Sequence, residues 1–214
     1  MTVPFVQAVP RLEVAVEDAK AVRFAAAPTL AFGLRLESDR PVRSLMLNAQ
    51  IRILPAQRAY GAADEERLVE LFGPVERWGD TLRSFLWTNT TLLVPPFEVA
   101  TTAELTVPCT YDLEVAAAKY FHALRDGDVP LELLFSGTVF FSGEDGLLQT
   151  AQIPWDCEAQ FRLPVSTWRD AIDVHFPGAA WLRLRQDVFD RLAAYRASRT
   201  LPTWEAAIEE LLDG

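Results

Sequence analysis

Alternation between apolar and polar residues constrains the fold of the first half of this chain more than any other feature. Four apolar side chains occupy every second position of TLAFGLRLES (residues 29–38): Leu30, Phe32, Leu34 and Leu36. VRSLMLNAQIRIL (42–54) continues the pattern from Leu45 to Ile53. A period of two is typical of β-strands with one buried face. The turn sequence SDRP separates the segments, which predicts a β-hairpin. The second segment, at thirteen residues, is long for a strand, which favours a bulge near Ser44.

Further segments predict additional strands, connected without regular βαβ alternation. They cover residues 12–18, a stretch from about Leu86, and residues 97–109, 129–141, 147–155 and 158–165. VPLELLFSGTVFF (129–141) is rich enough in apolar residues to be buried on both faces.

Helical periodicity occurs in the middle of the chain and dominates its end. The predicted helices cover residues 62–72, 111–124, 166–176, 186–198 and 202–212. Strands followed by helices indicate an α+β fold on an antiparallel sheet, with a helical C-terminal part. We therefore expect an antiparallel-sheet domain over residues 1–165. Residues 166–214 would form a helical extension that packs on the same domain.

Composition and charge exclude several classes of partner. The 214 residues carry a formal net charge of −10, which argues against nucleic acid and anionic membrane surfaces as partners. No apolar stretch approaches the roughly 20 residues that span a bilayer. The first residues lack the pattern of a secretory signal. With only Cys109 and Cys157, a disulfide scaffold is not expected, and the prediction is a cytoplasmic protein with reduced thiols.

The segment PCTYDLEVAAAKYFHAL (108–124) gathers reactive-looking side chains and raises the question of a catalytic cluster. A helix over 111–124 instead gives an apolar stripe, formed by Leu113, Ala116, Ala117, Tyr120, Phe121 and Leu124. Thr110 would cap this helix, and Asp112 and His122 would suit its two ends. We therefore interpret the segment as a core helix.

Cys109 is the residue of that segment without an evident role. A helix N-terminus lowers a thiol pKa, but His122 would lie ~19 Å along the helix at 1.5 Å per residue, too far to activate it. His175 could approach only through tertiary folding. The cysteines and histidines lack metal-site spacing, and nucleotide-binding and nucleophile motifs are absent. The sequence predicts no catalytic residue, metal ligand or cofactor, although a carboxylate pair among thirty acidic residues stays open.

The segment RWGDTLRSFLW (77–87) is the candidate protein-binding site. Tryptophan and arginine are favoured anchors of interfaces. The candidate residues are Arg77, Trp78, Asp80, Arg83 and Trp87. The alternative is that both indoles close the core beneath a long loop, as buried aromatic residues commonly do.

Several stretches together resemble a known family: RWGDTLRSFLWT, the segment VPCTYDLEVAAAKYFHALRDGDVPLELLFSGTVF, the IPWD step and LPTWEAAIEELL. The chain resembles, over nearly its whole length, an actinobacterial family known only as a domain of unknown function. Genes of that family often lie beside those of nickel-iron hydrogenases. The resemblance implies an accessory role for such an enzyme and supplies no catalytic residues.

A fainter resemblance concerns architecture alone. Antiparallel strands, a helix and then GDVPLELLFSGTVFF are similar to the order of elements in the export chaperone SecB, which is also acidic and binds unfolded polypeptide. The present sequence departs from it by adding the 143–165 region and the C-terminal helices.

These observations favour a non-enzymatic accessory or binding protein whose partner is a protein. In the more specific form of this hypothesis, the protein supports the assembly or function of a nickel-iron hydrogenase. Its oligomeric state is open. A SecB-like chaperone and an enzyme of unrecognised type are the alternatives. An apolar groove would distinguish the first alternative. A deep pocket with convergent polar groups would distinguish the second.

Overall fold

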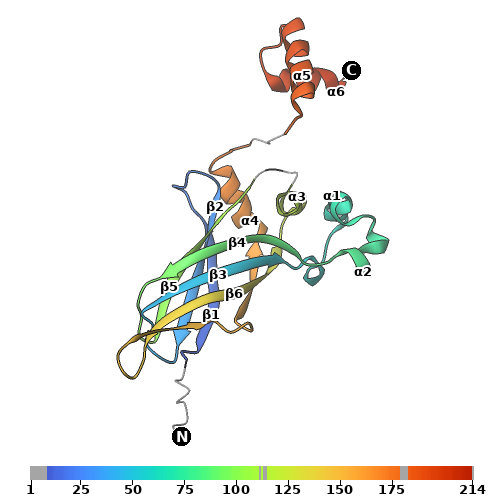
Figure 1. Ribbon diagram of the computed structural model, residues 1–214. Coiled ribbons are helices and arrows are strands. Elements are labelled where there is room, and N and C mark those ends of the chain that lie inside the picture. Colours follow the sequence, from blue (N-terminus) through green and yellow to red (C-terminus); the bar gives the residue numbers. More distant parts are fainter. Residues whose placement is uncertain (1–8, 111, 113–114, 179–182, 214) are drawn as a thin grey trace. The chain divides into compact units, whose positions relative to one another are not determined.

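The computed structural model describes residues 9–110, 112, 115–178 and 183–213. The chain divides into two compact units, Met1–Ala180 and Trp181–Gly214, which are treated separately below (Figure 1). The first unit contains all the strands that the structure describes, together with helices α1 to α4.

One antiparallel sheet of the first unit has three strands in the order β1-β2-β5. These strands are β1 (Leu12–Ala21), β2 (Thr29–Ser38) and β5 (Ala100–Pro108). The central strand β2 is the most buried of the three, and its predicted stripe from Leu30 to Leu36 is completely buried. A register shift between Val16 and Asp18 marks a bulge in the edge strand β1.

The second antiparallel sheet is centred on a long strand, β6 (Asp128–Ser142). On one side β6 pairs with β3 (Ser44–Ile53), which pairs in turn with β4 (Phe85–Val94). On the other side, two shorter strands pair with successive parts of β6: β7 (Leu148–Gln152) and β8 (Glu158–Pro164).

Gly137 lies in the middle of β6, where the pairing passes from β8 to β7. Its φ angle is +138°, and a Cβ atom at this position would lie 2.0 Å from the carbonyl oxygen of Met46 on β3. Only glycine satisfies both conditions. The Ser-Gly step in LFSGTVFF therefore allows β6 to continue through this position.

The predicted hairpin between residues 29–38 and 42–54 is wrong, because β2 and β3 lie in different sheets. The connecting residues cross from one sheet to the other. Along this crossing the Ser38 N–H donates to the Val99 oxygen (2.8 Å), and the Arg43 N–H donates to the Phe140 oxygen (2.7 Å). Both strands keep their predicted buried faces, but those faces meet across the core instead of lying side by side.

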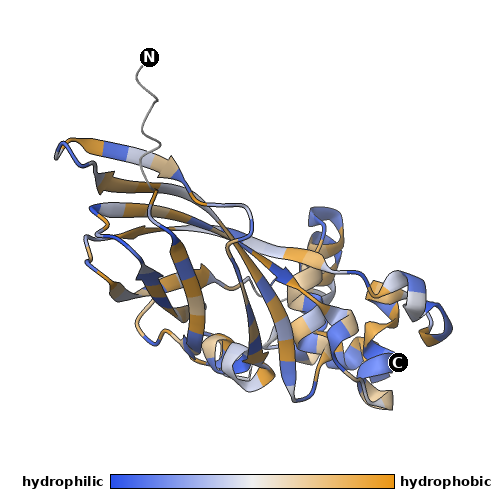
Figure 2. Ribbon diagram, turned by 90° about the horizontal axis from the view of Figure 1, so that it is seen from below, coloured by the Kyte–Doolittle hydropathy of each residue, from blue (hydrophilic) through white to orange (hydrophobic). Residues whose placement is uncertain are grey.

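One cluster of buried side chains draws on both sheets and on the helices packed against them. Apolar and polar positions alternate along the strands that flank this core (Figure 2). Helix α4 (Val165–Asp173) packs on β1 and β2, and α3 (Ala116–Ala123) packs against α1 and β4. The centre of the helical contact is Phe121, whose ring stacks on Trp168 of α4 at 5.2 Å with an interplanar angle of 9°.

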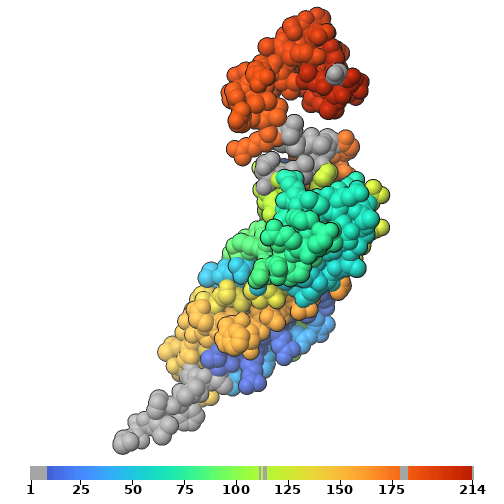
Figure 3. Space-filling view, turned by 90° about the vertical axis from the view of Figure 1, so that its right-hand side faces the viewer, coloured from blue at the N-terminus to red at the C-terminus, as the bar shows by residue number. Residues whose placement is uncertain are grey.

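An insertion between β3 and β4, residues 54–84, supplies the remaining short helices of the first unit. They are η1 (Pro55–Gln57), α1 (Ala62–Phe72), η2 (Val75–Arg77) and α2 (Trp78–Thr81). Helix α1 begins with Asp64 and Glu65 in its first turn, as the helix dipole favours, and Gly73 ends it at φ +75°. The insertion forms a prominent part of the face shown in Figure 3.

The second unit contains α5 (Gln186–Ser198) and α6 (Trp204–Asp213). The rings of Phe189 and Trp204 lie 5.2 Å apart, and the guanidinium of Arg196 lies over the Trp204 ring at 3.9 Å. The predicted domain boundary at residue 165 stays a prediction. The contacts of α4 with β1 and β2 join this helix to the sheet unit.

The expected α+β fold with antiparallel strands and C-terminal helices is confirmed. The predicted helix 111–124 is shorter in the structure, where α3 covers Ala116–Ala123. Leu113 of the predicted stripe lies outside the described residues, and Ala116 is exposed, whereas Tyr120, Phe121 and the other stripe members are buried. Among the described residues, no helix is both long and apolar enough to cross a membrane.

Candidate functional site

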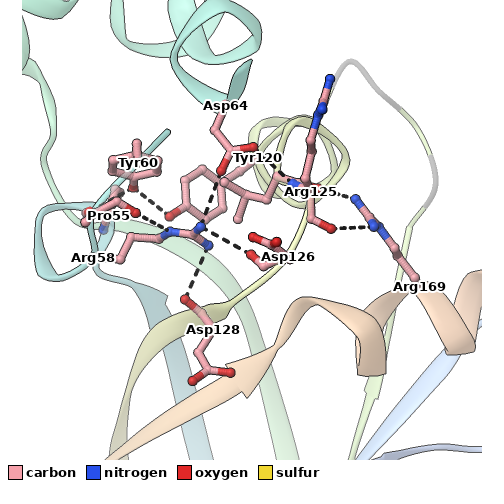
Figure 4. A network of polar contacts seen from close by, with 11 residues as sticks. Pro55, Arg58, Tyr60, Asp64, Tyr120, Arg125, Asp126, Asp128 and Arg169 are labelled. Atoms are coloured by element: carbon pink, nitrogen blue, oxygen red, sulfur yellow. Dashed lines mark hydrogen bonds and ion pairs between the residues drawn. The ribbon is translucent and has the colours of Figure 1, made fainter. Parts of the chain in front are cut away.

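A buried ion pair joins the β3–β4 insertion to the rest of the first unit (Figure 4). Arg58 and Asp64 lie 3.4 Å apart, and each side chain is only 8% exposed. The guanidinium of Arg58 also donates to the carbonyl oxygens of Asp126 (3.2 Å) and Asp128 (3.3 Å). Asp64 accepts the backbone N–H of Arg125 at 3.1 Å. The pair therefore links the start of α1 to the 125–128 turn that precedes β6.

Two tyrosines extend this network toward the core. Tyr60 donates its hydroxyl hydrogen to the Pro55 oxygen at 2.8 Å, so Tyr120 donates to the Tyr60 oxygen, which lies 2.8 Å away. Burial raises the pKa of both phenols above the ordinary value. Both hydroxyl groups are therefore held protonated, and the pair has the character of a structural link between the insertion and α3.

The surface beside this network carries an open groove between α1 and α3. Its volume is about 490 Å³, and it is lined by Arg67, Glu70, Leu71, Lys119, His122 and Ala123. Leu71 and Ala123 provide an apolar part, and Lys119 forms an ion pair with Glu70. Arg67 is exposed and makes no ion pair that the structure describes. We call this feature the α1–α3 groove.

The electrostatics of the α1–α3 groove are positive around His122, in a chain whose net charge is −10. Partial burial lowers the pKa of His122 below its ordinary value, and the charges of Arg67 and Arg169 lower it further. Arg169 is already engaged, since it donates to the carbonyl oxygens of Leu124 and Arg125 at the end of α3. The exposed Arg67 is therefore the group of this groove best suited to a negatively charged ligand, with His122 on the facing helix.

This combination of fold, network and groove occurs in a chain that a family model matches over residues 9–214. The chain belongs to DUF6084, a family of unknown function. No curated protein matches this DUF6084 member. Nearly all of the structure described here, including both groove helices and the C-terminal unit, lies within the matched range.

Comparison of this DUF6084 structure with solved structures found distant likenesses. The CARDB domain of a Pyrococcus furiosus protein in complex with di-metal ions has 11% identity and a TM-score of 0.27, covering 76% of this chain and 92% of that chain. The putative ApaA protein of Bordetella pertussis has 13% identity and a TM-score of 0.23, covering 72% and 92%. A β-glucosidase of Kluyveromyces marxianus has 10% identity and a TM-score of 0.27; this chain covers only 15% of it.

The structure divides the sequence-predicted binding segment between core and surface. Trp78 is buried, and its Nε1–H donates to the Gly73 oxygen at 2.9 Å. Trp87 is half-buried between Phe32 and Phe121, with ring centroids at 6.2 and 5.0 Å. Three charged members of the segment are exposed on the insertion: Arg77, Asp80 and Arg83. Protein binding by these five residues stays a prediction.

The thiols and histidines of this DUF6084 protein are held in surroundings unlike those of a nucleophile and its base. Cys109 is buried, with Sγ 3.6 Å from the Val107 oxygen, and burial raises its pKa to about 12. Burial, with a smaller effect of Asp156, raises the pKa of Cys157 to about 11. The two ring nitrogens of His175 lie 3.2 and 2.9 Å from backbone carbonyl oxygens. The described residues contain no group of three or more His, Cys, Asp or Glu placed to hold a metal ion.

We expect neither cysteine to react readily with a thiol reagent in the folded protein at pH 8, because the reactive thiolate is scarce so far below a raised pKa. Labelling by iodoacetamide should be at least about 100-fold slower than in guanidinium chloride, where ordinary pKa values return. Ser136→Cys supplies an exposed thiol as a control, since Ser136 lies on the surface of β6. Rapid labelling of native Cys109 would contradict the burial described here.

The raised thiol pKa values also fix the sign of a pH effect on stability. A thiol whose pKa is higher in the folded state stabilises the fold fully below the unfolded pKa and less as the pH rises above it. For Cys109 this stabilisation is expected to decline as the pH rises from the ordinary pKa of 9.0 to the raised pKa of about 12.

The groove residues Arg67, Lys119 and His122 were missed as a group by sequence reasoning. They come from two helices, α1 and α3, that are separated in the sequence by η2, α2, β4 and β5. One feature of the sequence could have indicated this group: Lys119, one of only two lysines in the chain, lies on the same predicted helix as His122.

Proposed function

We propose that the protein is a non-enzymatic accessory protein that binds a partner protein through the α1–α3 groove. The observation that carries this proposal is the open groove with Arg67, Lys119 and His122 in an otherwise acidic chain. A carboxylate of a partner can accept from the exposed Arg67 and from His122, while Leu71 and Ala123 contact an apolar group beside it.

The buried titratable groups support a binding role over catalysis. Catalytic groups usually have pKa values tuned toward neutrality. Here burial raises the pKa values of four groups further above neutrality, so that they stay protonated near pH 7: Cys109, Cys157, Tyr60 and Tyr120. The Arg58–Asp64 pair is fully engaged in fixing the insertion.

The partner that we propose is a nickel-iron hydrogenase subunit or its precursor. This part of the proposal rests on the resemblance of the sequence to a family whose genes lie beside hydrogenase genes. An acidic segment of such a subunit would fit the positive groove, and the accessory protein would act during assembly or support of the enzyme.

The test is capture of nickel-iron hydrogenase subunits by the tagged protein in a native host. Charge reversal by Arg67→Glu should reduce capture by about tenfold or more, as expected for loss of a charge-assisted contact. Arg40→Glu is the matched control, because Arg40 is an exposed arginine on the β2–β3 connection. Arg77→Glu changes the sequence-predicted segment 77–87 and not the groove, so this variant should capture hydrogenase as well as the wild type does. Absence of hydrogenase in the wild-type capture, or equal loss in the control, overturns the proposal.

NMR titration of His122 tests whether a ligand binds in the groove. The pKa of His122 should lie below the ordinary value of about 6.5, so the imidazole is mostly neutral at pH 7. A bound carboxylate favours the protonated form and therefore raises this pKa. An acidic peptide from the captured subunit should raise the pKa of His122. An unchanged His122 would contradict binding in the groove.

A SecB-like chaperone is the second candidate, favoured by large apolar side chains at the surface of the sheet unit. Phe24 is fully exposed, and Trp155 is 93% exposed. Capture of a heterogeneous set of unfolded chains, lost on Trp155→Ser and retained in Arg67→Glu, would favour this alternative. A purified protein that turns over a substrate, with activity lost in Cys109→Ala or His122→Ala, would instead favour an enzyme.

A further inference from the structure

Strand β7 lies at the end of the five-stranded sheet, and the structure describes no strand paired with its outer edge. The other edge strands have neighbours across the gap between the sheets. Strand β4 lies beside β5, where the Thr90 hydroxyl donates to the Thr106 oxygen at 3.1 Å, and β1 lies beside β8. Among the described strands, β7 is therefore the one whose edge is open to a further strand.

The pairing with β6 determines which backbone groups of β7 point outward. At the end of this pairing the Ile153 N–H donates to the Gly137 oxygen at 3.0 Å. Backbone groups alternate in direction along an antiparallel strand, so the odd-numbered residues of β7 bond to β6. The N–H and C=O groups of Leu148, Thr150 and Gln152 therefore point away from β6, and all three residues are exposed. They form a row of donors and acceptors with which an extended chain can pair.

Strand β7 lacks the features that commonly protect an edge strand from pairing. Such features are charged side chains, proline and bulges. The sequence LQTAQ contains no charge and no proline, and its register with β6 is regular. The edge strand β1, in contrast, carries four charged residues and a bulge. Large apolar side chains are exposed at both ends of β7: Leu147, Leu148 and Trp155. An added strand would find apolar contacts at each end.

The charge around β7 indicates which kind of segment fits its edge. Residues 126–161 include seven acidic residues and no lysine, arginine or histidine. Four of the acidic residues flank β7, two in the turn before it and two after it: Glu144, Asp145, Asp156 and Glu158. None of the four makes an ion pair that the structure describes. Arg43 donates to Ser142, but from the β3 side of β6, opposite to β7. An uncharged strand with acidic ends is complementary to an uncharged segment between basic residues.

A second copy of this chain is a poor match to the same edge. Antiparallel pairing of two β7 strands would bring Glu144 and Asp145 of one copy beside Asp156 and Glu158 of the other. Parallel pairing would place each acidic residue beside its own counterpart. Like charges on neighbouring strands are destabilising in both arrangements.

We propose that β7 binds an extended segment of a partner protein as an added strand, the segment having an uncharged, β-forming centre and basic residues at both ends. Backbone hydrogen bonds to Leu148, Thr150 and Gln152 supply the affinity, and the acidic residues at the two ends of β7 select the basic flanks. This site is separate from the α1–α3 groove, which is lined by residues of two helices.

Peptide binding to the full-length protein, followed by fluorescence anisotropy, tests this proposal. The peptide KKVTVTVKK should bind at least about tenfold more tightly than EEVTVTVEE, because its ends are complementary to those of β7. A form of KKVTVTVKK with N-methyl groups on its five central residues keeps the charges but cannot donate backbone hydrogen bonds there. It should bind at least about tenfold more weakly than the parent peptide. Equal binding of the two forms would show charge attraction alone and overturn the proposal.

Charge reversal at both ends of β7 tests the selection of basic flanks. Glu144→Lys combined with Asp156→Lys should reverse the preference, so that EEVTVTVEE binds more tightly than KKVTVTVKK. Glu66→Lys with Glu76→Lys is the matched control. It makes the same change in net charge at exposed positions of the insertion, which lies away from the β6–β7 hairpin (Figures 1 and 3). An equal shift of preference in the control would contradict recognition at β7.

Amide hydrogen exchange measured by NMR locates the added strand without any substitution. The amides of Leu148, Thr150 and Gln152 should exchange rapidly in the free protein and at least about tenfold more slowly with KKVTVTVKK bound. The amides of Gln149 and Ala151, which face β6, should be protected in both states. Unchanged exchange of the three outward amides would refute the site. Protection of the same amides at rising protein concentration without peptide would assign the edge to a second copy and overturn the proposed occupant.

Discussion

Replacing Asp64 with alanine is expected to lower the free energy of unfolding by about 3–5 kcal/mol, the cost of leaving one member of a buried ion pair without its partner. Arg58 would remain enclosed, with its guanidinium facing the carbonyl oxygens of Asp126 and Asp128. The backbone N–H of Arg125 would also lose its acceptor. Urea unfolding followed by circular dichroism measures the change.

Two comparisons separate this effect from an ordinary loss of surface charge. Glu37→Gln breaks an exposed ion pair with Arg35 and should change stability far less. Removing both partners, by Arg58→Met with Asp64→Leu, should cost less than Asp64→Ala alone, because no uncompensated charge stays buried. If the double substitution were the more harmful, desolvation of Arg58 would not be the cause.

The alternation of apolar residues identified strands and their buried faces but could not identify their neighbours. The same inward-facing stripe serves β2 and β3 whether they pair in one sheet or oppose each other across a core. The choice depends on distant segments: β2 pairs with β5, whereas β3 pairs with β4 and β6. The short SDRP turn therefore suggested a hairpin where the chain in fact crosses between sheets.

The candidate site was less accessible to prediction than the fold, because its residues come together only through tertiary packing. Arg58 and Asp64 are six residues apart, but the partners that enclose them lie in the 125–128 turn. The helix carrying Tyr120 and Phe121 was recognised as part of the core from its period alone. For Trp78 and Trp87 the sequence left core and interface open, and no local pattern distinguishes a buried indole from an exposed one.

Replacing Phe121 with alanine should produce a loss of similar size, about 3–5 kcal/mol of unfolding free energy, because it removes a large side chain from a closely packed core. Phe121 is 0% exposed. Its ring lies 5.2 Å from Trp168 of α4 and 5.0 Å from Trp87 of β4, so one side chain links α3 to a second helix and to a strand.

The spectroscopic signature of this variant distinguishes loss of packing from a general loss of structure. Near-ultraviolet circular dichroism should change at the tryptophan bands, because Trp87 and Trp168 lose their common aromatic neighbour. The far-ultraviolet spectrum below the unfolding transition should stay the same. Phe24→Ala is the matched control, a phenylalanine that is 100% exposed, and it should alter stability by less than about 0.5 kcal/mol. Equal losses in the two variants would contradict the central place of Phe121 in the core.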